Sequence, residues 1–289
     1  MCKRTSYNYF DSRNRQTHDV AVKLKEASID FKNAGVNELV VDLPFNGGGA
    51  VSSCQLLASM ITTESNVNTS FQRMYYNATI TNKYYSAKGY ADVPFLTTAQ
   101  MKGEYYGNTV NGVRLALSRV YVLVSGQSAS ASEALIFGLR GAQNTVEVVV
   151  IGEQTVGKTV GMTLRDKTLG DYDYEMWPVS FVMGNSKGVK ANTEPKANGR
   201  GGYKGGIVPD RTIREMYILG WKELGDPEEG LLAAAIYHMD NGTFPTSRAV
   251  TAAQATRANI ALSAAQIDFS PTLRNGGMRD HRAAVTPDN

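Results

Sequence analysis

Cysteine is scarce in this sequence, with two residues among 289. Cys2 stands at the start of the chain, and Cys54 falls at an apolar position of a helical pattern. Two cysteines placed in this way form neither a disulfide framework nor the ligand spacing of a metal site. We therefore expect Cys54 to be a core residue, and we expect neither a metal nor another cofactor.

The sequence also lacks a long hydrophobic run. No stretch reaches the roughly eighteen apolar residues of a membrane-spanning helix, and the opening MCKRTSYNYFDSRNRQ contains no apolar segment of a signal peptide. Two interpretations stay open: a cytoplasmic protein, or a gene product whose beginning is missing from this chain.

A strong charge of either sign is missing too. The 30 lysines and arginines nearly balance the 27 aspartates and glutamates. The basic residues are scattered, without the dense run or interleaved aromatics of a nucleic-acid-binding protein, so nucleic acid is not an expected partner. With 42% hydrophobic residues, the chain can bury a large core, as one large domain or two small ones.

Strands and helices alternate along much of the chain, which predicts an α/β core containing parallel strands. The spacing of apolar residues and the positions of glycines define these elements. In order, they are a helix from Val20 to a cap at Gly35, strand 38–43, helix 50–61, strand 119–124, helix 128–140 and strand 146–151.

The remaining segments carry weaker patterns. Residues 65–112 contain a strand-like piece at 75–80 and are interpreted as an insertion over the core. A last helix is predicted to open at Asp226, where an acidic cap precedes a proline. The expected organisation is a domain over 1–245, its N-terminal part open to truncation, followed by a weakly ordered tail over 246–289.

Residues 152–159 read GEQTVGKT, the pattern of a phosphate-binding loop. Such a loop runs into a helix, whose N-terminus completes the anion site. Lys158 is instead followed by residues 159–164, which are β-branched and nearly alternating, as is typical of a strand. A nucleotide-binding protein is therefore only a remote alternative.

Ser130 is a better partner for Lys158. We expect Ser130 at the start of a helix, where a neutral lysine could remove its proton; holding a lysine neutral requires about 4 kcal/mol of environmental bias. The N–H groups of Ala131 and of the glycine turn at 47–49 could then stabilise an oxyanion. A plain alternative fits the spacing equally, because Ser130 and Glu133 also form the pattern of a helix capping box.

Three blocks carry a family resemblance. The blocks Asp42-Leu43-x-x-Asn46-Gly47-Gly48-Gly49, Ser128-Ala129-Ser130-Ala131-Ser132-Glu133 and Gly152-Glu153-x-Thr155-x-Gly157-Lys158 resemble, in this order, the signature blocks of the C-terminal processing (tail-specific) serine proteases. The later Gly205-Gly206-Ile207-Val208-Pro209-Asp210 resembles a block near the end of that family's catalytic domain. The chain looks most similar to secreted or lipid-anchored members from Bacteroides-like bacteria.

The resemblance implies an α/β fold with a crotonase/ClpP-like core of mixed strands and helices, here without a PDZ module, and a periplasmic or cell-envelope location. It also implies a serine endopeptidase that cleaves polypeptide substrates near their C-termini through a Ser/Lys dyad and an acyl-enzyme. The expected site consists of Ser130 as nucleophile, Lys158 as general base, Gly47, Gly48 and Ala131 as oxyanion hole, and Glu133 and Asn46 as supporting residues.

The chain departs from the family pattern at two positions and in having no PDZ module, and the missing glutamine and the missing module favour an alternative. Pro44 replaces a common arginine, and Met162 replaces a glutamine that orients the lysine, which methionine cannot do by hydrogen bonding. The alternative is a catalytically weak or inactive peptide-binding relative. The histidines do not favour a Ser–His mechanism, because His18 precedes the first helix, His238 lies near the end of a helix and His281 lies in the tail.

Overall fold

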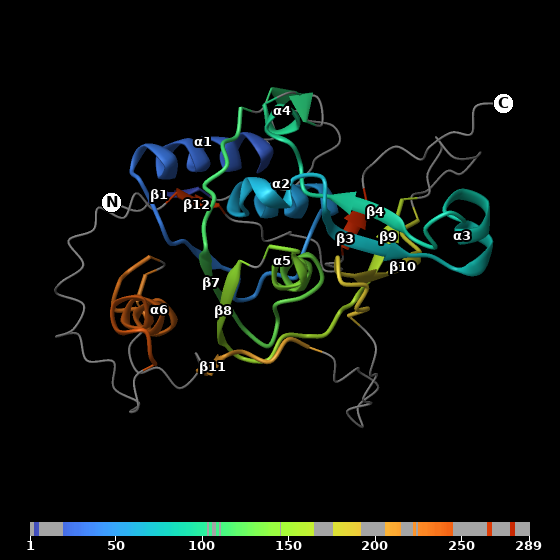
Figure 1. The fold of residues 1–289 in the computed structure, drawn as a ribbon. Helices are drawn as coiled ribbons and strands as arrows, with labels where there is room; N and C mark the ends of the chain where they lie inside the picture. Colours follow the sequence, from blue (N-terminus) through green and yellow to red (C-terminus); the bar gives the residue numbers. More distant parts are fainter. Residues whose placement is uncertain are drawn as a thin grey trace.

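Figure 1 shows the computed structural model of the chain, in which two sheets lie on either side of one central helix. The structure describes residues 3–5, 20–102, 104–105, 108–109, 111–144, 146–164, 176–191, 206–214, 222–223, 225–244, 265–267 and 278–280. Among these residues, no helix has the length and apolar character needed to cross a membrane.

The first sheet has four strands in the order β11-β8-β7-β2. They are β2 (Val40–Asp42), β7 (Arg119–Val124), β8 (Glu147–Gly152) and β11 (Arg211–Thr212). Every pairing in this sheet is parallel. Parallel neighbours need a long crossover connection, which the intervening helices supply. The predicted α/β core with parallel strands is therefore confirmed.

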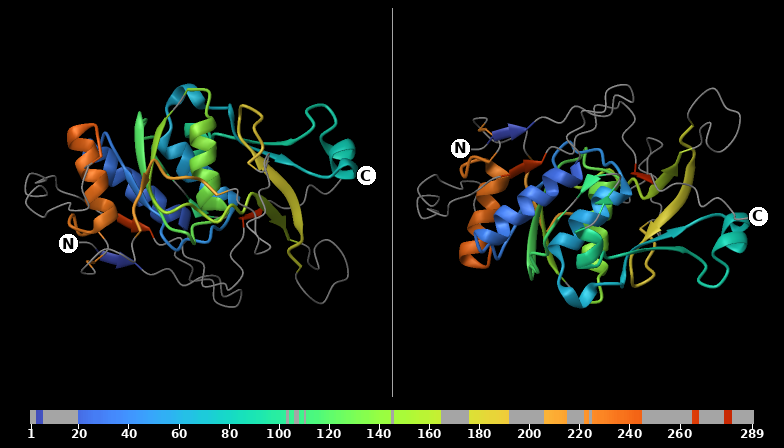
Figure 2. Two further views of the ribbon diagram at one scale, coloured as in Figure 1. Left: turned by 90° about the horizontal axis from the view of Figure 1, so that it is seen from below. Right: turned by 90° about the horizontal axis from the view of Figure 1, so that it is seen from above.

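Helices cover both faces of the parallel sheet (Figures 1 and 2). α2 (Val51–Ile61) and α5 (Ala131–Gly141) share a core cluster with Val120, Val122 and Val124 of β7. α6 (Gly230–Asn241) packs on the other face, against Tyr121 and Leu123. Because alternate residues of a strand point to opposite faces, β7 is buried on both sides. α1 (Val20–Asn33), which ends before a left-handed Gly35, packs on α2.

The second sheet has five strands in the order β13-β9-β10-β3-β4. They are β3 (Ser70–Tyr75), β4 (Ala91–Pro94), β9 (Val160–Thr163), β10 (Val179–Gly184) and β13 (Met278–Asp280). Phe71, Phe95 and Phe181 from this side join the same core cluster as α5. The close approach of α5 to β3 requires a glycine at position 138, since a Cβ on Gly138 would lie 2.3 Å from the Phe71 ring. Figure 2 shows α5 between the two sheets.

The sequence suggested that residues 65–112 form an insertion over the core. This interpretation is wrong, because β3 and β4 contribute residues to the core itself. The expected strand at 75–80 is also wrong. β3 ends at Tyr75, and helix α3 (Ala78–Tyr84) begins because the Asn77 side chain accepts the Ile80 N–H at 3.0 Å. The same region contains the short elements η1 (Glu64–Asn66), α4 (Thr98–Met101), β5 (Glu104–Tyr105) and β6 (Asn108–Thr109).

The start of α6 also differs from the expectation. The cap is Glu229 rather than Asp226, because the Glu229 carboxylate accepts the N–H groups of Leu231 and Leu232. Of the predicted tail over 246–289, the structure describes β12 (Ala265–Ile267), which pairs with β1 (Lys3–Thr5), and β13. The rest of that tail, like Cys2, lies outside the described residues.

Candidate active site

Three loops meet at the carboxyl edge of the parallel sheet, and they carry the three sequence blocks. The loops are 43–49 after β2, 125–130 after β7 and 152–159 after β8. Ala129 donates its N–H to the Asn46 carbonyl at 3.0 Å, and Val156 donates to the Ser128 carbonyl at 3.0 Å. This edge is where open parallel sheets bind ligands.

Ser130 occupies a strained position at the centre of this junction. Its φ of 59° and ψ of −111° lie outside the regions that residues with a side chain ordinarily adopt. Strain of this kind concentrates at functional sites, and a sharp strand-to-helix turn that carries a serine is the geometry of a nucleophile elbow. The Ser130 side chain is fully buried, and its hydroxyl has no hydrogen-bond partner among the described residues.

The capping-box alternative explains only part of this geometry. One of the two hydrogen bonds of a capping box is present, since Glu133 Oε2 accepts the Ser130 N–H at 2.8 Å. On the other side, the Ser130 side chain faces the backbone N–H of Glu133 in the arrangement of a capping box, but it makes no cap hydrogen bond there and its oxygen is unpaired. An unpaired buried hydroxyl costs free energy, so it calls for an explanation other than helix capping.

Glu133 is a buried carboxylate that accepts four donors. Oε1 accepts Thr155 Oγ1 at 2.5 Å and the Gly157 N–H at 2.6 Å. Oε2 accepts the N–H groups of Ser130 and Lys158, each at 2.8 Å. Because the Ser130 and Lys158 nitrogens each lie 2.8 Å from the same oxygen, they are separated by at most twice that distance. Burial raises the pKa of Glu133 above its ordinary value, although all four donors act in the opposite direction.

The glycine turn packs directly on Ser130. Gly48 has a φ of 106°, and a Cβ there would lie 2.7 Å from Ser130 Cβ and 2.8 Å from the Ala131 nitrogen. The Gly48 N–H donates to Asn46 Oδ1 at 2.9 Å, whereas no described group accepts the Gly47 N–H. Ala131 is the first residue of α5, where an N–H has no intrahelical acceptor.

The flanking serines have structural bonds that Ser130 lacks. Ser128 Oγ donates to the Leu43 carbonyl at 2.8 Å and accepts the Ser125 N–H at 2.9 Å. Ser132 Oγ lies 3.0 Å from both the carbonyl and the Oδ1 of Asn46. Among the three serines of the block, the hydroxyl without a partner is that of the middle one.

Thr155 is a structural residue whose role the sequence did not reveal. Besides its bond to Glu133, Thr155 Oγ1 accepts the Ile207 N–H at 2.7 Å. A Cβ on Gly206 would lie 1.9 Å from the Thr155 carbonyl, so only glycine fits there. The fourth sequence block therefore lies against the loop of Lys158, although Gly205 itself lies outside the described residues.

The loop at 152–159 does not have the form of a phosphate site. It continues into strand β9 instead of a helix, as the sequence predicted. The N–H groups of Gly157 and Lys158, which would hold a phosphate, are both bound by the Glu133 carboxylate. A protein carboxylate thus occupies the anion position.

Histidine is absent from the described part of this site. His238 lies on α6, across the parallel sheet from α5, and its Nδ1 is 2.9 Å from the Tyr121 hydroxyl. His18 and His281 lie outside the described residues. Within the described ranges, no group of three His, Cys, Asp or Glu side chains is placed to hold a metal ion. Cys54 is buried, as predicted.

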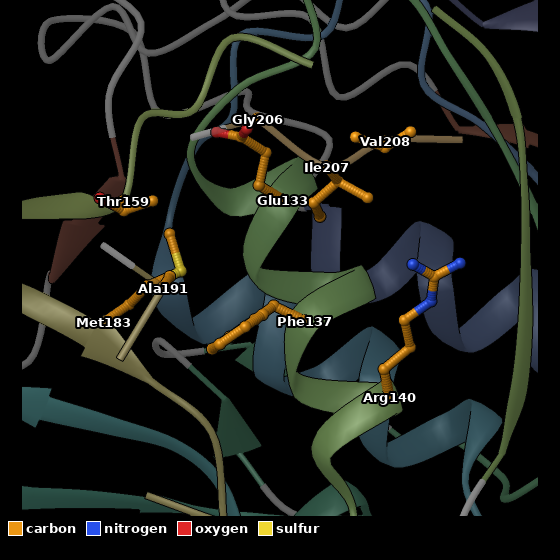
Figure 3. Close-up of a pocket in the computed structure, with 9 residues that line it drawn as sticks. All are labelled: Glu133, Phe137, Arg140, Thr159, Met183, Ala191, Gly206, Ile207 and Val208. Carbon is orange, nitrogen blue, oxygen red and sulfur yellow. The ribbon is translucent and has the colours of Figure 1, made fainter. Parts of the chain in front are cut away.

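A pocket of about 320 Å³ lies beside the site, along α5 (Figure 3). Glu133, Phe137 and Arg140 project from successive turns of the helix, and Ile207 and Val208 lie across from them. Both charged groups are already paired, Glu133 within the site and Arg140 with Asp210 and the Val148 carbonyl. The free surface is therefore mostly apolar. The other lining residues are Thr159, Met183, Ala191 and Gly206.

The sequence model of peptidase family S41 matches residues 7–211 of the chain, which is well over half of its length. The chain belongs to peptidase family S41. This is a family of serine peptidases, and the resemblance seen in the sequence blocks is confirmed. None of the curated proteins matches the chain.

The chain is also similar to solved structures. A candidate S41 protease from Bacteroides fragilis NCTC 9343 is 27% identical with a TM-score of 0.59, and the match covers 76% of this chain and 49% of that one. The photosystem II D1 C-terminal processing protease is 20% identical with a TM-score of 0.45, and the match covers 68% of this chain and 40% of that one. The chain thus spans about half, or less, of the length of these structures.

Proposed function

We propose that this S41 chain is a serine endopeptidase in which Ser130 is the nucleophile and Lys158 the general base. The observation that carries the proposal is the buried Ser130 hydroxyl, which has no described partner and sits on a strained elbow. The backbone of Lys158 is bound to the same carboxylate oxygen as the backbone of Ser130, which supports pairing these two side chains.

In the proposed reaction, Ser130 Oγ attacks the carbonyl carbon of a peptide bond while its proton passes to the neutral amine of Lys158. The resulting oxyanion is stabilised by backbone N–H groups. When the C–N bond breaks, the protonated Lys158 gives its proton to the leaving amine, and an ester on Ser130 remains. Water then attacks the ester with Lys158 again as base, which releases the new carboxylate and restores the serine.

The oxyanion donors in this proposal are the N–H of Ala131 and one from the glycine turn. Gly47 is the readier donor of that turn, because the Gly48 N–H is engaged by Asn46 Oδ1 and would have to exchange that acceptor for the oxyanion. Glu133 and Asn46 act as positioning residues, since each ties Ser130's segment to a neighbouring loop. Because Ser130 is fully buried, a loop must move before substrate can reach it.

The proposed substrates are polypeptides cut near their C-termini, an assignment that rests on the resemblance of the sequence blocks to the C-terminal processing proteases. The same resemblance motivates a periplasmic or cell-envelope location. Fractionation of the native host followed by immunoblotting tests the location, and recovery of the protein only with cytoplasmic markers would contradict it.

A peptide-binding relative without turnover is the second candidate. It is favoured by the complete burial of Ser130 and by Met162, which lies on β9 where a lysine-orienting glutamine is common in the family. This candidate requires that peptides bind and remain intact.

The test compares Ser130→Ala and Lys158→Ala with the wild type on an unfolded protein that has an apolar C-terminus. Mass spectrometry of the products locates the cut. We expect each variant to lose at least about a thousandfold in kcat/KM, as for residues that act as one catalytic unit. Full activity in either variant would disprove the dyad, and intact substrate in the wild type would favour the binding relative.

Ser128→Ala and Ser132→Ala are the matched controls, because they remove a hydroxyl from the same block. Both hydroxyls are bonded to loop 43–49. Ser128→Ala leaves the buried Ser125 N–H without its side-chain acceptor and is expected to cost about 1–3 kcal/mol of stability. Ser132→Ala should cost less, because both Asn46 oxygens keep another donor, the N–H groups of Ala129 and Gly48. Rates are therefore compared at a temperature where all variants are folded. Under that condition, the controls should retain most of the activity.

A further inference from the structure

Phe45 is an exposed aromatic residue in a conformation that aromatic residues avoid. Its side chain is 53% exposed, and its φ of 61° lies in the left-handed region. Glycine and asparagine occupy this region readily, whereas a bulky residue there is a genuine outlier. Phe45 therefore has neither a packing reason nor a backbone reason to be phenylalanine.

The backbone of Phe45 is held in place by the machinery around Ser130. Its N–H donates to Ser125 Oγ at 2.9 Å. The next residue, Asn46, is buried and binds both Ala129 and Ser132. The turn is thus fixed on both sides of Phe45, and the fixed backbone presents the ring to solvent.

Val156 is a second exposed apolar residue of the same junction, with a side chain 46% exposed. Its N–H donates to the Ser128 carbonyl, so Phe45 and Val156 are both bonded to the turn between Ser125 and Ser128. That turn leads directly into Ser130. These two residues are the large apolar side chains that loops 43–49, 125–130 and 152–159 expose.

We propose that Phe45, together with Val156, contacts an apolar side chain of the polypeptide substrate and so determines which chains are held at Ser130. The inference rests on the proposed function and names the specificity of that site. A substrate side chain covering the two residues would remove their apolar surface from water, which favours binding. Retaining a strained phenylalanine is understandable if the ring has this role, since backbone strain persists where function uses it.

Peptide binding is measured separately from cleavage. Fluorescence anisotropy follows fluorescein-labelled decapeptides, with either leucine or serine at the last four positions, binding to the Ser130→Ala protein. We expect the leucine peptides to bind more tightly. Adding Phe45→Asn should weaken the leucine peptides about tenfold, which corresponds to 1.4 kcal/mol, and leave the serine peptides nearly unchanged.

Phe45→Asn is the informative variant because asparagine tolerates the left-handed backbone, so the fold should be as stable as before or more so. Phe45→Leu keeps an apolar side chain and should retain most of the binding. Tyr84→Ala, which removes a 47% exposed aromatic from α3, and Gln127→Ala, an exposed polar residue in the adjacent turn, should change nothing.

Unchanged peptide affinity in Phe45→Asn would overturn the inference, as would the absence of any peptide binding by the parent protein. A change of molecular mass in size-exclusion chromatography without a change in peptide affinity would assign Phe45 to contact between copies and overturn it too. The outcome is independent of the dyad. Lost peptide selectivity supports the inference even if the wild type cuts nothing, and an active wild type with unaltered affinity in Phe45→Asn refutes the inference alone.

Discussion

The backbone N–H groups of Ser130 and Lys158 converge on a single oxygen atom, Oε2 of Glu133, at 2.8 Å each. These residues come from the turn before α5 and from the loop before β9, so one buried carboxylate fixes two segments that are far apart in sequence. Its other oxygen binds the same loop at Thr155 and Gly157. Glu133 therefore sets the relative position of the proposed nucleophile and base.

Replacing Glu133 by glutamine is expected to damage both stability and activity. Glutamine keeps the shape, but its NH₂ group would face two donors where a carboxylate oxygen accepted them. We expect the free energy of unfolding to fall by about 2–3 kcal/mol, because buried donors lose their acceptor. The kcat/KM value should fall about a hundredfold even at temperatures where the variant is folded, since small displacements of reacting groups are costly.

Glu153→Gln is the matched control for this substitution. Glu153 lies in the same loop and is 35% exposed, facing Arg214 at 3.8 Å. A surface pair of this kind contributes little to stability. Urea unfolding and initial rates of the two variants can be compared directly. Equal effects of the two substitutions would show that Glu133 has no special positioning role.

The raised pKa of Glu133 predicts how stability depends on pH. Burial disfavours the ionised form in the folded protein, so between the unfolded value of about 4.3 and the raised folded value the folded state binds more protons. In that window, the contribution of Glu133 to the free energy of unfolding falls as the pH rises, and above it the contribution is constant.

Urea unfolding across mildly acidic to neutral pH tests this prediction. The difference in stability between wild type and Glu133→Gln should decrease as the pH rises through the window and then level off. Glu133→Gln carries no titrating group at this position and serves as the reference. A difference that grows with pH would mean that the four donors outweigh burial, and it would contradict the prediction.

The order of the elements could be predicted from the sequence because periodicity reports burial directly. β7 runs from Arg119 to Val124, as its apolar run indicated, and the strand pattern after Lys158 correctly argued against a phosphate loop. The blocks also identified which loops meet. The prediction of a strand at 75–80 was wrong because the Asn77 side chain caps the start of helix α3. A single capping hydrogen bond produces no periodic pattern of apolar residues in the sequence.

The side-chain network of the candidate site could not be predicted in the same way. Ser130-x-x-Glu133 fits a capping box by spacing, and only geometry shows that the Glu133 carboxylate is shared with the distant Lys158 loop. The strain at Ser130 and Phe45 is equally invisible in the sequence, because it is imposed by tertiary contacts on residues with no preference for positive φ.

Adjacent glycines provide a sharp test of the oxyanion turn. A Cβ on Gly48 would collide with Ser130 Cβ at 2.7 Å and would be forced into a φ of 106°, whereas a Cβ on Gly49 meets nothing within 4 Å. Gly48→Ala should therefore reduce kcat/KM at least about a hundredfold by displacing Ser130. Gly49→Ala should remain active. Comparable activity in both variants would show that the turn does not need to contact the serine.

The pH dependence of the rate distinguishes a lysine base from a histidine base. Only an unprotonated amine can accept the Ser130 proton, so kcat/KM should rise with pH from the neutral into the alkaline range. With a histidine base, kcat/KM would instead rise near pH 6.5, because the ordinary pKa of imidazole is about 6.5. His238→Gln is the control, because His238 lies on α6, across the sheet from Ser130, and should leave the profile unchanged. A profile already level at neutral pH, or one that shifts in His238→Gln, would rule out Lys158 as the base.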